Sequence, residues 1–201
     1  MNQLLKSISY VFHPLLMPLL GVVFYFSKTP RFIPESIMKA KVFSIAILTI
    51  VLPILLFYLL RTINKVDTFH LETVKERRIP LLINGIIIVL ILTRVLPQDE
   101  IPELYFFFIG ILISTITCFT LAYAKFKTSI HMIGSAGFFM FAVAVAIHFQ
   151  ININGTIALM CIIIGAIATS RLHMKAHTPI ELITGFFVGL IPQLVLLNYW
   201  M

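Results

Sequence analysis

The stretch from Ser170 to Glu181 places ionisable side chains between two long apolar runs. Five side chains that can carry charge lie within its twelve residues, Ser-Arg-Leu-His-Met-Lys-Ala-His-Thr-Pro-Ile-Glu. Charged groups are costly at membrane depth, so such a cluster indicates a functional site. Thr178, Pro179 and Glu181 have the types and spacing of a helix start with a capping box. The cap explains the acid but not the two histidines and the arginine beside it.

This stretch resembles the third signature of the type-2 phosphatidic acid phosphatases, a metal-free superfamily shared with the vanadium haloperoxidases. The match consists of Ser170-Arg171, five residues, His177, three residues and an acid, Glu181, where the family usually has Asp. The resemblance implies that His177 is a nucleophile that forms a phosphohistidine, and that Glu181 orients its imidazole. It also implies that Arg171 and Ser170 bind the substrate phosphate, with neither a metal nor another cofactor.

The second family signature, Pro-Ser-Gly-His, has a partial counterpart in Thr128-Ser129-Ile130-His131. The resemblance implies that His131 protonates the leaving group and that Ser129 holds a phosphate oxygen. Ile130 replaces the glycine and cannot reach all the backbone conformations open to glycine, so the loop is expected to differ. The alternative is that His131 is an interfacial histidine at the start of an apolar run.

The first signature, a lysine, six residues and Arg-Pro, has the loosest counterpart, Arg78 with a proline two residues later. Lys75 or Lys127 would then replace the signature lysine, if any residue does. Arg77 and Arg78 are better candidates, because a guanidinium group binds phosphate in a bidentate fork. Arg77 could equally be a positive residue that flanks a membrane span. We therefore favour Arg78.

Two other interpretations remain open. His173, His177 and Glu181 are spaced four residues apart, which would place three metal ligands on one face of a continuous helix. That spacing leaves a metal-dependent membrane hydrolase as an alternative, although Thr178 and Pro179 indicate that a helix begins between the last two ligands. The other alternative is a non-catalytic lipid-binding or transport protein whose basic residues recognise anionic headgroups.

The composition excludes a soluble domain. Hydrophobic residues make up 60% of the chain and charged residues 11%, with a mean hydropathy of +1.03, whereas soluble domains are ~45–50% apolar. The net charge of +7 lies mostly at short loops and helix ends, which suits anionic headgroups or phosphate. We expect no nucleic-acid partner, since no basic tract with interleaved aromatic residues occurs.

Apolar runs long enough to cross a bilayer recur along the whole chain. They predict an all-α, polytopic transmembrane helical bundle of six or seven helices that forms a single integral membrane domain over residues 1–201, with the family resemblance covering about 67–190. The first run is expected to be a broken or re-entrant helix, because His13 and two prolines interrupt it. The runs lie near 9–27, 42–60, 79–97, 103–123, 133–150, 154–171 and 180–200.

Because each pair of spans returns the chain to the same side, the connections after the second, fourth and sixth runs must share one face of the membrane. These three connections carry all three signature stretches. Small residues within the runs, Gly85 and 134–137, are expected to permit close helix packing.

The side of the membrane that carries the site stays open. The signature face holds ten Lys and Arg residues against five on the other face, which favours the cytoplasm by the positive-inside rule. The resemblance points outward, because bacterial relatives usually act on lipid phosphates from outside the cytoplasm. Removing Arg78, Lys127 and Arg171 as phosphate ligands leaves seven against five. We predict a protein of the bacterial inner membrane that hydrolyses a lipid mono- or diphosphate of a class that the sequence does not specify.

Overall fold

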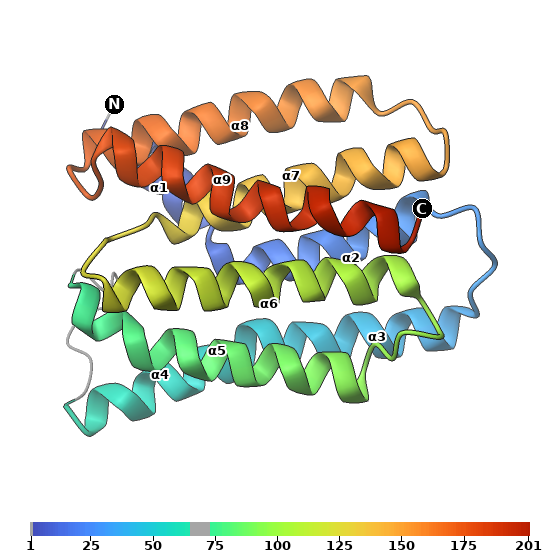
Figure 1. Ribbon diagram of the computed structural model, residues 1–201, viewed down its shortest axis with the longest axis horizontal. Coiled ribbons are helices and arrows are strands. Elements are labelled where there is room, and N and C mark those ends of the chain that lie inside the picture. The colour runs from blue at the N-terminus through green and yellow to red at the C-terminus, as the bar shows by residue number, and fades with distance from the viewer. Residues whose placement is uncertain (1, 65–72) are drawn as a thin grey trace.

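The computed structural model describes residues 2–64 and 73–201, and all regular structure within them is helical (Figure 1). Residues 65–72, which include Lys65 and the beginning of the 67–190 stretch, lie outside the described residues. The helices are α1 (Asn2–Val11), η1 (Pro14–Leu16), α2 (Met17–Lys28), α3 (Glu35–Ala46), η2 (Ile47–Val51), α4 (Leu52–Thr62), α5 (Val74–Arg94), α6 (Pro102–Tyr123), α7 (Ile130–His148), α8 (Asn154–His173), α9 (Pro179–Leu196) and η3 (Leu197–Tyr199).

Within residues 2–64 and 73–201, six helical segments are long and apolar enough to cross a membrane, and they identify an integral membrane protein. The segment Ser7–Lys28 contains the first helices, and Glu35–Thr62 joins α3, η2 and α4; the other four are built on α6, α7, α8 and α9. Helix α5 has 21 residues, which at a rise of ~1.5 Å per residue is enough to cross a hydrocarbon core of ~30 Å. Its first turn carries several charges, including Arg77 and Arg78. The expectation of six or seven membrane helices is confirmed.

The spans alternate in direction, so their connections collect at two ends of the bundle (Figure 1). The start of α1, the end of α4, the start of α5 and the connections after α6 and α8 lie at one end, which we call the site end; it is on the left in Figure 1. The connections after α2, α5 and α7 lie at the other end with the C-terminus, and we call it the far end. The three signature stretches therefore share one end, as their order along the chain predicts.

The first span is broken, as predicted. Helix α1 ends at Val11, and His13 adopts an extended conformation before the short turn η1 and helix α2. Pro14 and Pro18 each lack a backbone N–H and occupy the first turns of these two elements, where a missing donor is tolerated. The prolines therefore end one helix and begin the next without an unsatisfied donor.

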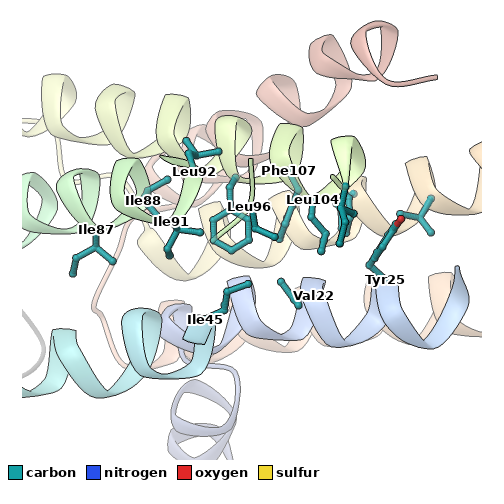
Figure 2. Packing of buried hydrophobic residues seen from close by; sticks show 14 residues of the cluster. Val22, Tyr25, Ile45, Ile87, Ile88, Ile91, Leu92, Leu96, Leu104 and Phe107 are labelled. Carbon is teal, nitrogen blue, oxygen red and sulfur yellow. The ribbon is translucent and has the colours of Figure 1, made fainter. Parts of the chain in front are cut away.

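The main hydrophobic core lies toward the far end (Figure 2). Side chains of α2, α3, α5, α6 and α7 form it, and Phe107 stacks on Phe141 with ring centroids 4.1 Å apart. Next to this core the fully buried Glu103 carboxylate accepts a hydrogen bond from Tyr25 and pairs with Arg31 at 2.9 Å. The far end is thus held both by apolar packing and by an ion pair between the buried Glu103 and the partly exposed Arg31.

Helices α7 and α9 approach closely through glycines. A Cβ at Gly185 would lie 2.7 Å from the carbonyl oxygen of Ser129, and a Cβ at Gly189 would overlap the carbonyl oxygen of Ile133. Gly137 also faces α9, with Gly189 O at 3.4 Å from its would-be Cβ. The expected role of the 134–137 stretch is confirmed at Gly137, whereas the expectation for Gly85 is wrong, because Gly85 faces open space.

Candidate functional site

A tight turn between α8 and α9 positions His177. Helix α8 ends at His173, and the N–H of Ala176 returns to the carbonyl of Arg171 at 3.1 Å while Lys175 takes a left-handed conformation with φ 52°. Thr178 then caps α9 through a capping box with Glu181, as the sequence predicts. These two helix ends leave His177 little freedom, because both its neighbours are fixed by backbone hydrogen bonds.

The imidazole of His177 is held by the acid that caps the helix. His177 Nδ1 lies 2.9 Å from Glu181 Oε2, and the same oxygen accepts the backbone N–H of Thr178 at 3.1 Å. Because a carboxylate oxygen accepts, Nδ1 carries the hydrogen and the neutral ring keeps its lone pair on Nε2. An imidazole oriented in this way is suited to act as a nucleophile.

Burial lowers the pKa of His177 from its usual 6.5 to about 4. The hydrogen bond to Glu181 raises this pKa, but the charges of Arg77 and Arg171 lower it. The residue is only 7% exposed, so water stabilises the imidazolium poorly. The ring is therefore neutral, and able to attack an electrophile, from neutral pH down to pH 5.

We expect a direct titration of His177 to show this shift. Histidine-labelled protein in nanodiscs, followed by NMR, should give His177 a pKa near 4, and His177→Gln assigns the signal. Glu181→Gln should lower the pKa further, since the carboxylate raises it. Because the folded pKa lies below the unfolded one, the associated stability is present above pH ~6.5 and is lost as the pH falls toward 4. A pKa of 6.5 or higher would contradict the assignment.

Two buried arginines from different helices reach the same cavity as His177. Arg77 lies in the first turn of α5 and is 4% exposed, and Arg171 lies in the last turn of α8 and is 6% exposed. Arg77 donates a hydrogen bond to the carbonyl of Thr128 at 2.8 Å. Burying two guanidinium groups near each other costs free energy that a bound anion can offset.

Several buried donors near these arginines have no partner within the described part of the chain. They are Arg171 Nε, Thr128 Oγ1 and Ser129 Oγ. The backbone N–H of Ser129 bonds to the carbonyl of Glu181 at 3.2 Å, which ties the start of α7 to the His177 turn. Unsatisfied buried donors are costly, and an anion in the cavity would satisfy Arg171 Nε, since Arg171 lines the cavity. Thr128 and Ser129 do not line it, so the expected contact of Ser129 with a phosphate oxygen stays a prediction.

His131 lines the same cavity, and the N-terminal segment holds it there. Its Nε2 lies 3.2 Å from the carbonyl oxygen of Ser9. A carbonyl oxygen can only accept, so Nε2 carries a hydrogen and Nδ1 is the nitrogen that can gain or lose a proton. Ser9 Oγ in turn lies 2.8 Å from Ser170 Oγ. The hydroxyl of Ser170 therefore anchors the N-terminal segment.

The remaining basic candidates do not reach the cavity. Arg78 stacks over the ring of Tyr123 at 4.3 Å, and Lys127 Nζ donates to the carbonyl of Ala176 at 3.2 Å. Lys75 is exposed. Contrary to the preference for Arg78, it is Arg77 that lines the cavity, because consecutive helical residues point ~100° apart and α5 turns Arg77 toward it. Which arginine binds phosphate stays a prediction.

The helix required by the metal-site alternative is not formed. Helix α8 ends at His173 and α9 begins at Pro179, so His173, His177 and Glu181 do not share one helix face. His173 is exposed, whereas His177 is buried against Glu181. The break between the two helices places His173 apart from the hydrogen-bonded pair of His177 and Glu181.

The cavity has a volume of about 940 Å³, and its arginines and histidines gather at the site end, while its deeper lining is mostly apolar. Along α5 it runs from Arg77 to Ile87, about 15 Å at a rise of ~1.5 Å per residue. Helix α4 forms the opposite wall with Phe57 and Leu60, next to the wide turn η2 and Pro53. Such a shape accepts a molecule with a charged head and a long apolar tail.

Sequence reasoning missed two kinds of cavity residue. His13 lines the cavity beside His131, with ring centroids 5.6 Å apart, and its position between two prolines in an apolar run was the available signal. Gln193 and Thr115 line the deeper part, where Gln193 donates to the carbonyl of Phe107 at 2.9 Å. Nothing in the local sequence of these two residues distinguishes them from packing residues.

No protein-family model, curated protein or solved structure matches this chain.

Proposed function

We propose that this protein is a metal-independent phosphatase of the bacterial inner membrane, resembling the type-2 phosphatidic acid phosphatases, that hydrolyses a lipid phosphate or diphosphate. One observation carries the proposal: His177, His131, Arg77 and Arg171 come from three separate stretches of the chain and meet at the site end of one largely apolar cavity. Phosphoryl transfer needs cations around the phosphoryl oxygens, a nucleophile in line and a proton for the departing oxygen. Each of these needs has a candidate here.

The first step forms a phosphoenzyme. Arg77 and Arg171 hold the phosphoryl oxygens, and the lone pair of His177 Nε2 attacks phosphorus as the bond to the leaving oxygen breaks. Glu181 stabilises the positive charge that develops on the ring through Nδ1–H. With the phosphate anion bound, His131, anchored on the Ser9 carbonyl through Nε2–H, takes up a second proton on Nδ1 and donates it to the leaving oxygen.

The second step regenerates the enzyme. Neutral His131 accepts a proton from water as that water attacks phosphorus. The P–N bond breaks, its electron pair returns to His177 Nε2, and inorganic phosphate leaves. His131 has then recovered its proton, so the cycle consumes only lipid phosphate and water.

Trapping of the intermediate tests the proposal. Purified protein, mixed for a single turnover with phosphate-labelled phosphatidate or polyprenyl diphosphate in the presence of chelator, should carry label that survives alkali and is lost in acid. Activity that the chelator abolishes would support a metal site instead. Binding of the lipid phosphate with neither label nor turnover would support a non-catalytic lipid-binding protein.

A further inference from the structure

The break in the first span brings a third histidine into the site. His13 is extended, with φ −67° and ψ 139°, and caps the short turn η1 that begins at Pro14. The segment lies outside all three stretches that carry the family resemblance. Even so, its ring faces the ring of His131 at 5.6 Å between centroids and at an angle of 77°.

The hydrogen bonding of His13 fixes its tautomer. The backbone N–H of Leu15 donates to His13 Nδ1 at 3.3 Å, so this nitrogen is an acceptor. In a neutral ring the hydrogen then lies on Nε2. His13 therefore presents a neutral N–H donor in a cavity that it shares with Arg77, Arg171 and His177.

Charge favours a neutral donor at this position. The guanidinium groups of Arg61, Arg77 and Arg171 already line the cavity, and His131 carries a further proton during the proposed reaction, so an additional cation at His13 would be repelled. A neutral imidazole N–H adds a hydrogen bond to an anion without adding charge. Neutral histidines that polarise substrate oxygens in this way are known in other enzymes.

We propose that His13 is a further catalytic residue, which donates a hydrogen bond from Nε2 to a phosphoryl oxygen on the side of the leaving group. The inference rests on the proposed function for its chemistry. It places His13 beside His131, the proton donor, and makes Ser9 a positioning residue that aims the His131 ring through its carbonyl. The segment Ser9–Leu15 thus forms a fourth part of the site.

Two substitutions separate catalysis from structure. His13→Asn keeps an acceptor near the position of Nδ1 for the Leu15 N–H but removes the donor, whereas His13→Gln keeps an N–H near the position of Nε2. We expect His13→Asn to lower kcat roughly 100-fold, as loss of one preorganised donor does. His13→Gln should have a higher kcat than His13→Asn. If His13 served only to accept the Leu15 N–H, His13→Asn would have the higher kcat of the two variants, and that result would overturn the proposal.

Phosphate binding tests the same contact without relying on turnover or on a variant. In wild-type protein with labelled histidine, inorganic phosphate should shift the NMR signal of His13 Nε2, and the absence of any shift would overturn the proposal. His13→Asn should also bind inorganic phosphate more weakly by calorimetry. If wild type forms no phosphohistidine yet these effects occur, the proposed phosphatase fails while His13 stands as an anion ligand.

Discussion

Replacing His177 with alanine is expected to lower chelator-resistant hydrolysis of the lipid phosphate by roughly four orders of magnitude or more, because the step that forms the phosphoenzyme loses its nucleophile. Among the described residues of the site, only His177 has a ring oriented by a carboxylate, with Nδ1 2.9 Å from Glu181 Oε2. The rate should be followed as inorganic phosphate released by purified protein in mixed micelles.

His173→Ala is the matched control for this experiment. His173 ends the neighbouring helix only four residues away and is exposed, so its loss should leave the rate within about twofold of wild type. His177→Ala should still bind inorganic phosphate, since Arg77 and Arg171 remain. Hydrolysis retained by His177→Ala would refute the phosphohistidine mechanism, and an equal loss in His173→Ala would reopen the metal-site alternative.

Replacing Gly189 with alanine is expected to destabilise the bundle by roughly 1–3 kcal/mol, the usual cost of overpacking. The added methyl would overlap the carbonyl oxygen of Ile133, which is backbone and cannot rotate away. Helices α7 and α9 must then separate, and this separation strains the bond from the Ser129 N–H to the Glu181 carbonyl. Both the melting temperature in detergent and the rate of phosphate release should fall.

Gly165→Ala is the control for the glycine prediction. Gly165 lies on α8, and a Cβ there would meet no heavy atom within 4 Å. The substitution also improves helix propensity, so stability should stay level or rise slightly. Equal melting temperatures for Gly189→Ala and wild type would show that the close approach of α7 and α9 is not needed for the fold.

Local signals in the sequence were sufficient to predict the membrane spans, the N-terminal cap of α9 and the break in the first span. Thr178, Pro179 and Glu181 predicted where α9 begins because a capping box depends on residues four positions apart at most. The prolines around His13 predicted an interrupted first helix for the same reason. The parity of seven spans then placed the three signature stretches at one end of the bundle.

Features that depend on how helices rotate and pack could not be predicted in this way. Arg77 and Arg78 are adjacent in sequence, and only the packing of α5 decides which one faces the cavity. The approach of Gly189 to Ile133 depends on the register between two helices, because these residues are 56 positions apart in the sequence. The contact between His13 and His131 likewise joins segments that no local pattern relates.

The unequal distribution of packing along the bundle has a consequence for how the protein can work. The tight core and the buried Glu103 ion pair occupy the far end, whereas the cavity hollows the site end. The cavity meets this core at Ile87 and Phe107, and α4 forms its other wall. If a lipid tail occupies the cavity, as proposed, substitutions along the α4 wall should change tail preference with less effect on folding than substitutions in the far-end core.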